Sequence, residues 1–123
     1  MILIIDTADK NKISLLVEKD GKKIAGKTIK TDRNQSEKLL ISIDKLLGSN
    51  NFKLSQIKGI KVAHQGSSFT SLRIGVLTAN ALAYALGLRV EPVEKSGKFL
   101  KKLRDFNIVV PDYKREINFK EIK

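Results

Sequence analysis

The spacing of apolar residues alternates along the chain between the two-residue period of strands and the longer period of helices. An unbroken apolar run at 2–5 is typical of a strand buried on both faces. Two further segments, 13–19 and 22–30, flank Asp20-Gly21, a pair that tolerates the positive φ angles of a two-residue hairpin turn. The pattern therefore predicts three antiparallel strands at the start of the chain, of which the polar third lies at a sheet edge.

A helix is predicted after these strands, between Asn34 and Gly48. Asn34 and Glu37 have the spacing of a capping box, in which each side chain accepts a hydrogen bond from a backbone N–H of the first turn. Gly48 supplies the left-handed residue at which helices commonly end, and Ile41 widens the apolar surface beyond one stripe. The stripe itself consists of Leu39, Leu40, Ile43, Leu46 and Leu47.

A second helix is predicted at about 70–86, and Arg73 is its only charged residue. Apolar side chains occupy nearly its whole circumference, and such a helix is normally buried on all sides. A helix on the surface of so small a protein should expose one polar side to water. This helix has no such side, so we expect a partner helix to cover it. The weakly charged stretch at 74–88 is too short for a membrane span and contains Thr78 and Asn80.

The remaining segments complete an alternating order of strands and helices. We expect one helical turn at 54–57, strands at 59–63 and 88–93, a short basic helix at 96–106 and a last strand at 108–110. The order βββαβαβ is that of a ribonuclease-H-like layer. The expected fold class is therefore α/β, with a mixed five-stranded sheet and helices packed on it.

Composition narrows the class of protein without deciding its function. The 123 residues suffice for one domain, and the absence of cysteine excludes disulfides, a thiolate zinc site and a cysteine nucleophile. No basic leader precedes the first apolar run, which meets Asp6 too soon for a signal peptide. We therefore expect a soluble, cytoplasmic protein with no membrane association.

The net charge of +11 makes a polyanionic partner worth testing. The last 29 residues hold 9 basic and 4 acidic side chains, so the net positive charge per residue is more than twice that of the preceding chain. A solvated surface is the simpler interpretation of such a run, and contact with RNA phosphates is the alternative. The candidate tRNA contacts are Lys98, Lys101, Lys102, Arg104, Lys114 and Arg115.

Three features that suggest chemistry have a simpler structural interpretation. Residues 21–28 match the P-loop pattern G-x-x-x-x-G-K-[ST], but they begin in the predicted hairpin turn and no helix follows, so no phosphate-binding P-loop is expected. Asp6, at the end of the first strand, could hold magnesium only with further carboxylates, and no carboxylate cluster stands out. His64 is the only histidine, which excludes a metal site built from several histidines, and we expect a structural role for it.

The most distinctive segment is QGSSFTSLRIG at 65–75. Small residues ahead of a helix can form an anion-binding loop, and Ser68 or Thr70 can cap the helix. The same composition suits a tight turn from strand to helix, with Gly75 allowing close packing of that helix. Physical reasoning alone favours the tight turn.

This segment closely resembles the signature G-S-F-T-G-L-R-I-G of the TsaB (YeaZ) family. Further similarity lies at 4–8 (IIDTA) and at 33–40 (RNQSEKLL), where the family has R-x-H-S-E-x-L-L. The resemblance covers residues 1 to about 95. It carries the family signature loop over to Ser68, Phe69, Thr70, Leu72, Arg73 and Gly75.

The resemblance implies an actin-like ATPase (ASKHA) fold and a part in making threonylcarbamoyladenosine on tRNA. Members of the family are similar in fold to the catalytic subunit TsaD, lack its metal-binding motif and act as its non-catalytic partner. They form homodimers, or heterodimers with TsaD, through their two N-terminal helices. The interface residues implied here are Leu39, Leu40, Ile43, Leu46, Leu47, Arg73, Leu77, Asn80, Ala81 and Tyr84.

The resemblance thus predicts a subunit that binds and activates a TsaD-like enzyme, with tRNA met through the complex and a TsaE-like ATPase as a further partner to test. It assigns no catalytic residue, metal or cofactor to this chain, and it leaves open whether ATP and magnesium bind in the complex. Two alternatives belong to other classes. One is a nucleotide hydrolase or nuclease that uses Asp6, and the other is a stand-alone basic RNA-binding module.

The chain also departs from the family. Residues 64–67 (HQGS) stand in place of the family's glycine-proline loop, and Ser71 replaces a glycine. Most of the family's second lobe has no counterpart, although 111–115 (PDYKR) resembles its P-x-Y-x-R. We expect a single domain with a TsaB-like lobe at 1–95, followed at 96–123 by a short basic helix and tail that remain from the second lobe.

Overall fold

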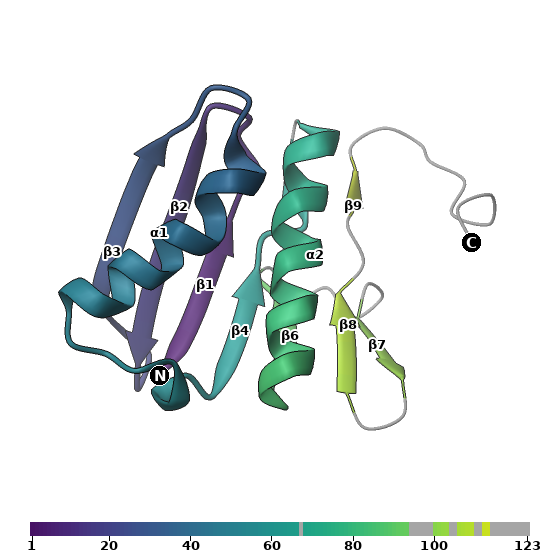
Figure 1. Cartoon of the computed structure of the whole chain (residues 1–123). Helices are drawn as coiled ribbons and strands as arrows, with labels where there is room; N and C mark the ends of the chain where they lie inside the picture. The colour runs from purple at the N-terminus through teal and green to yellow at the C-terminus, as the bar shows by residue number, and fades with distance from the viewer. Residues whose placement is uncertain (67, 94–99, 104–105, 110–111, 114–123) are drawn as a thin grey trace.

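A mixed five-stranded sheet is the centre of the fold (Figure 1). The computed structural model describes residues 1–66, 68–93, 100–103, 106–109 and 112–113. In the strand order β3-β2-β1-β4-β6, β2 is antiparallel to both neighbours, whereas β1, β4 and β6 are parallel, which confirms the predicted α/β class. The strands are β1 (Ile2–Asp6), β2 (Lys12–Lys19), β3 (Lys22–Lys30), β4 (Gly59–Val62) and β6 (Arg89–Pro92).

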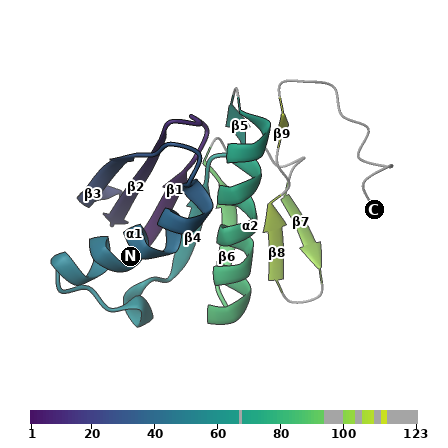
Figure 2. The same ribbon diagram turned by 45° about the horizontal axis from the view of Figure 1, so that its top comes forward.

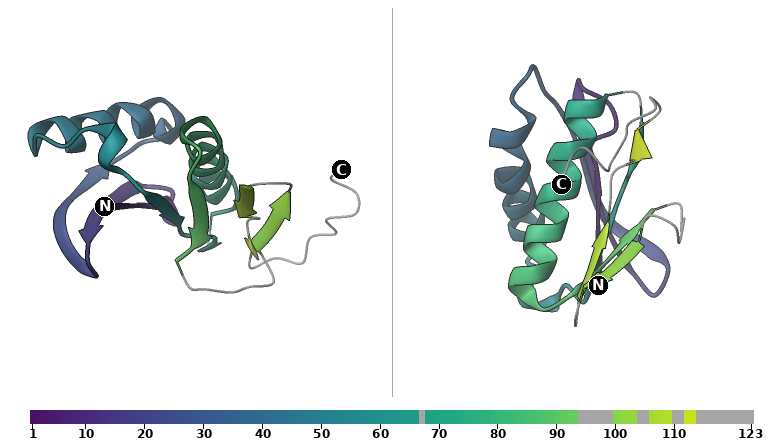
Figure 3. Two further views of the ribbon diagram at one scale, coloured as in Figure 1. Left: turned by 90° about the horizontal axis from the view of Figure 1, so that it is seen from below. Right: turned by 90° about the vertical axis from the view of Figure 1, so that its right-hand side faces the viewer.

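Two helices, α1 (Gln35–Ser49) and α2 (Phe69–Leu86), cover one face of this sheet, as Figures 2 and 3 show. α1 packs on β2 and β3, α2 packs on β4, β6 and β1, and the two helices contact each other. A short 3-10 helix (Leu54–Gln56) leads into β4, where one helical turn was expected. The two helices therefore form a single layer above the sheet.

The core lies between the sheet and this helical layer. On β1, Leu3 and Ile5 are fully buried, whereas Ile2 and Ile4 are only half-buried on the other face. The prediction that β1 is buried on both faces is therefore wrong in part, because both helices lie on one side and no described element covers the other. The further core residues of the strands are Ile13, Leu15, Val17, Ile60, Val62 and Val90.

The predicted hairpin turn is present between β2 and β3. Asp20 has a φ of 54° and Gly21 a φ of 78°, the left-handed values that a two-residue turn of this kind needs. The P-loop-like residues 21–28 run from this turn into β3, a strand, so the sequence match has no phosphate-cradling geometry.

Both ends of α1 differ from the prediction. Within the described chain Asn34 makes no capping bond, and its Oδ1 instead accepts a hydrogen bond from the Asp32 N–H at 3.0 Å. Gly48 lies inside the helix, and the left-handed residue is Asn51, with a φ of 58°. Asn50 closes the helix, because its Nδ2 donates to the Leu46 carbonyl at 2.8 Å. The N-terminus of α1 therefore has no side-chain cap among the described residues, and a polar side chain, that of Asn50, replaces the predicted glycine stop at the C-terminus.

The predicted helix at 96–106 is wrong where the structure describes it. Two antiparallel strands, β7 (Leu100–Leu103) and β8 (Phe106–Val109), lie there, and β8 runs beside β6. The strand expected at 108–110 is confirmed in part by β8. A short strand β9 (Asp112–Tyr113) pairs with β5 (Gln65–Gly66), which brings a segment distant in the sequence next to the start of α2.

Candidate functional site

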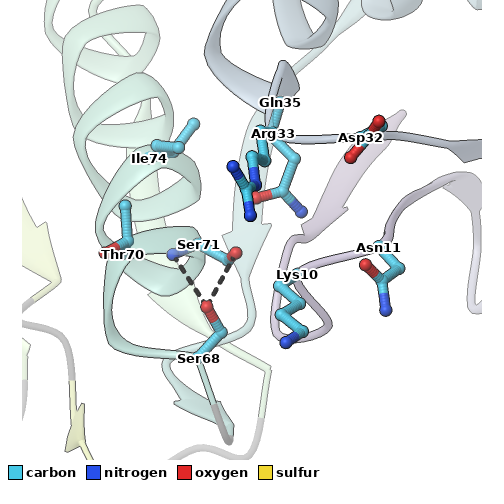
Figure 4. Close-up of a pocket in the computed structure, with 9 residues that line it drawn as sticks. All are labelled: Lys10, Asn11, Asp32, Arg33, Gln35, Ser68, Thr70, Ser71 and Ile74. Carbon is cyan, nitrogen blue, oxygen red and sulfur yellow. Dashed lines mark hydrogen bonds between the residues drawn. The ribbon is translucent and has the colours of Figure 1, made fainter.

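The start of α2 is capped by Ser68. The Ser68 Oγ accepts a hydrogen bond from the Ser71 N–H at 3.3 Å and donates one to the Ser71 Oγ at 2.9 Å (Figure 4). The Leu72 N–H donates to the Ser68 carbonyl at 3.1 Å, which begins the helical ladder. Of the two capping residues that the sequence offered, Ser68 is the one used.

The first turns of α2 are fixed to the end of β1. The Thr7 hydroxyl donates a hydrogen bond to the Ser71 carbonyl, and both residues are buried. A Cβ on Gly75 would collide with the Thr7 side chain, so only glycine allows this approach. Gly66 lies similarly close to Ala8, because a Cβ on Gly66 would be 2.7 Å from the Ala8 Cβ. The close helix packing that the tight-turn interpretation predicted at Gly75 is therefore confirmed.

A cavity of about 470 Å³ lies beside this turn (Figure 4). Three chain segments contribute to it besides α2: the β1–β2 loop, the β3–α1 loop and the start of α1. Gln35 connects two of them, since its Nε2 donates to the Asp9 carbonyl at 2.7 Å and to the Lys12 carbonyl at 3.1 Å. The lining residues are Lys10, Asn11, Asp32, Arg33, Gln35, Ser68, Thr70, Ser71 and Ile74.

Lys10, Arg33 and Gln35 were not predicted from the sequence as residues of this site. The available signal was their position, because Lys10 follows the first strand and Arg33 precedes the first helix. Both loops lie at the end of the strands next to the start of α2, so residues of the two loops line the same cavity. Periodicity, which the prediction used, carries no information on such loop residues.

An exposed apolar surface lies on the outer sides of α1 and α2. Four of its side chains keep more than half of their surface accessible: Leu40 at 54%, Ile41 at 56%, Leu77 at 59% and Tyr84 at 67%. A groove of about 320 Å³ separates the helices, lined by Leu40, Leu77, Thr78, Ala81 and Leu82. The five residues Leu40, Ile41, Leu77, Ala81 and Tyr84 are called the apolar helix face below.

The structure divides the predicted interface residues into two groups. Leu40, Arg73, Leu77, Ala81 and Tyr84 are exposed, and Asn80 is half-buried. Four others are part of this chain's own core and have almost no accessible surface, so their assignment to a partner surface is wrong. These are Leu39 at 0%, Ile43 at 4%, Leu46 at 2% and Leu47 at 5% exposure.

The second helix is buried on one side only. Leu72, Val76, Ala79 and Ala83 pack on the sheet, but α1 lies beside α2 without covering its outer side. The expected burial on nearly all sides is therefore absent within the described chain. The stretch at 74–88 was predicted to be too short for a membrane span. The observed helix α2 is longer, with 18 residues from Phe69 onward, and by length and composition it is apolar enough to cross a membrane, so that prediction is corrected. Core helices of soluble proteins meet the same criterion.

Neither Asp6 nor His64 lies in a metal-binding group. Among the described residues, no three histidines, cysteines or carboxylates gather closely enough to hold an ion. The Asp6 Oδ1 accepts a hydrogen bond from the Ala8 N–H at 2.9 Å, so this carboxylate shapes the β1–β2 loop. His64 is buried between β4 and β5, with 1% of its surface exposed.

The predicted tRNA contacts in the basic tail stay a prediction. Lys98, Arg104, Lys114 and Arg115 lie outside the described residues. Lys101 and Lys102 lie on β7, within a β-hairpin and not on the expected helix.

Comparison with known proteins connects this fold to tRNA modification. Residues 28–101 match the model of the family TsaD, tRNA N6-adenosine threonylcarbamoyltransferase. Among solved structures, YeaZ from Pseudomonas aeruginosa is similar with 25% identity and a TM-score of 0.68, over 75% of this chain and 42% of that one.

A second structure, of an uncharacterized protein with similarity to peptidase YEAZ from Pseudomonas aeruginosa, gives the same identity, coverage and TM-score. No curated protein sequence matches significantly. The chain thus spans less than half the length of the two solved structures.

Proposed function

The chain belongs to the TsaD family and has a YeaZ-like fold, and from this membership we propose that it is a non-catalytic subunit that binds and activates a TsaD-like enzyme. In this proposal the enzyme forms threonylcarbamoyladenosine on tRNA, and this chain meets the tRNA as part of the assembly in the cytoplasm. The residues that carry out the reaction belong to the partner subunit. A TsaE-like ATPase is a further candidate member of the complex.

The apolar helix face is the observation that carries the proposal. Its residues come from two adjacent helices and flank a groove, so a partner helix can insert side chains between them. Contiguous exposed apolar surfaces of this kind mark interaction sites in soluble proteins. Complete burial of a fully exposed leucine contributes roughly 1.5–3 kcal/mol, and Leu40 and Leu77, at 54% and 59% exposure, still have just over half of that surface to bury.

The proposal is tested by co-expression with the TsaD-like subunit of the same organism. The two proteins should elute together, and Leu77→Asp or Leu40→Asp should lower the amount of retained partner at least tenfold. The reason is that binding would bury an unpaired carboxylate in an apolar groove, which costs several kcal/mol. Circular dichroism should show that both variants stay folded, because each replaced side chain is more than half exposed.

Leu54→Asp is the matched control. Leu54 is an exposed leucine at 41%, but it lies on the 3-10 helix and outside the apolar helix face. This variant should retain the partner as well as the unmodified protein does. Two separately eluting proteins, or equal retention by Leu77→Asp and Leu54→Asp, would rule out the proposed interface.

A further inference from the structure

Positive charge gathers on the hairpin formed by β2 and β3. Residues 12–30 hold six basic and two acidic side chains, whereas the rest of residues 1–93 holds nine basic and six acidic ones. The net positive charge per residue is therefore several times higher on the hairpin. Its six lysines are all exposed and are called the basic hairpin below: Lys12, Lys19, Lys22, Lys23, Lys27 and Lys30.

Two pairs of these lysines face each other across the strands. Lys12 lies directly opposite Lys30 at one end of the hairpin, and Lys19 lies opposite Lys22 beside the turn. Like charges directly opposite each other on neighbouring strands destabilise a sheet. A neutral residue at one position of each pair would remove the repulsion, so the fold alone does not account for the two pairs. A bound polyanion would neutralise both.

The basic hairpin forms one edge of the sheet. Within the described residues β3 pairs only with β2, and Figure 1 shows it on the side of the sheet away from β6 and β8. Lysines on an edge strand also prevent pairing with strands of other molecules. That role accounts for the lysines of β3, but Lys12 and Lys19 belong to β2, which lies between β1 and β3. The cations thus extend over two strands, which suits a polyanion broader than one added strand.

The same surface favours a nucleic-acid duplex over a single strand. Residues 12–30 contain no phenylalanine, tyrosine or tryptophan, so no aromatic ring is present on which an unpaired base could stack. The two lysine pairs are eight residues apart on β3, which is about 27 Å along an extended strand. One strand of a duplex presents several phosphates over that length. Double-stranded RNA is bound mainly through its phosphates and its shape.

We propose that the basic hairpin binds the phosphate backbone of a double-helical RNA segment without reading its sequence. The identity of this RNA as a helical arm of tRNA rests on the proposed function, whereas the contact with duplex phosphates does not. The surface is separate from the apolar helix face on the outer sides of α1 and α2, so RNA and the TsaD-like subunit can bind together. It also lies at the sheet edge opposite to the β7–β8 hairpin, which holds Lys101 and Lys102.

Fluorescence anisotropy of a labelled RNA duplex of about 20 base pairs, titrated with the full chain at several salt concentrations, tests the proposal. Lys12→Gln combined with Lys30→Gln should weaken binding about tenfold. It should also lower the slope of log affinity against log salt by about 2, because two phosphate contacts are lost. The double variant should resist urea at least as well as the unmodified protein, because it removes a like-charge pair. Loss of affinity is thereby separated from loss of fold.

Two matched double variants remove the same charge elsewhere. Lys45→Gln with Lys53→Gln acts at exposed positions outside the hairpin and should change the affinity less than twofold. Lys114→Gln with Arg115→Gln acts in the basic tail and should weaken binding less than the hairpin variant does. Equal weakening by the hairpin variant and the first control, or a loss confined to the tail variant, would overturn the proposal.

Other polyanions distinguish RNA from a protein or a membrane. At equal charge concentration, neither poly-glutamate nor vesicles containing phosphatidylserine should displace the RNA duplex. Displacement by either one, or no saturable binding of the duplex at low salt, would overturn the proposal. The hairpin variant should still elute together with the TsaD-like subunit, so a failure here is distinguishable from a failure of the proposed function.

Discussion

Gly75 shows how a single position can fix the geometry of a site. Its missing side chain lets α2 approach β1 until the Thr7 hydroxyl reaches the Ser71 carbonyl. That contact places the first turn of α2, with the cap residue Ser68, against the β1–β2 loop that carries Lys10. The glycine of the signature segment is thus a packing residue that positions the wall of the cavity.

We expect Gly75→Ala to lower the free energy of unfolding by about 2 kcal/mol, because the new methyl group forces α2 away from Thr7. Gly48→Ala is the matched control, since a Cβ there meets no described atom within 4 Å. That change should raise stability by up to about 1 kcal/mol, because alanine is the better helix former. Urea unfolding of both variants measures the difference, and stabilisation by both changes would contradict the packing role.

At the scale of elements, periodic patterns predicted more than local end signals did. The buried residues Leu39, Ile43, Leu46 and Leu47 of α1 follow from spacing, because burial against a sheet selects apolar side chains at helical intervals. The one-sided burial of α2 does not, since its apolar residues occupy nearly the whole circumference. The caps of α1 were wrong because several nearby polar groups compete for the same backbone atoms. Asn34 bonds to Asp32, and the left-handed residue after the helix is Asn51, three positions beyond the expected Gly48.

The β7–β8 hairpin shows where such patterns become ambiguous. Leu100 and Leu103 are three residues apart, which suits one turn of helix and also the two ends of a four-residue strand. Strand β8 contains Ile108 and Val109, β-branched residues that favour extended structure, and it lies beside β6. The pairing of β7 with β8 decides between helix and strand here, and a single sequence does not show which segments pair.

Two adjacent leucines of α1 separate core packing from partner binding. Leu39 is fully buried and Leu40 is 54% exposed, although both belong to the predicted stripe. We expect Leu39→Ala to lower the free energy of unfolding by about 3 kcal/mol, because it leaves a cavity in the core. Leu40→Ala should cost less than about 0.5 kcal/mol, as is usual for surface positions. Thermal and urea unfolding measure both, and equal costs would mean that Leu40 also stabilises the fold.

At the scale of the whole molecule, the two candidate surfaces occupy different places. The apolar helix face lies on the outer sides of α1 and α2, and the cavity of about 470 Å³ lies at the first turns of α2. Sequence motifs identified the family, and helical spacing indicated the first surface. The cavity was not foreseen, because it forms from loops that only the folded sheet brings together. The net charge of +11 did not indicate where on the molecule either surface lies.

The proposed partner surface also makes a prediction about self-association. In the proposal the same apolar helix face serves a second copy and the TsaD-like subunit, so the two partners would compete for it by mass action. We expect the chain alone to form dimers at high concentration, and Leu77→Asp to stay monomeric. Sedimentation velocity of the labelled chain should then show the dimer replaced by a one-to-one complex as the TsaD-like subunit is added. A labelled chain that stays dimeric while it binds the subunit would show that two separate surfaces are used, and Leu77 would belong to only one of them.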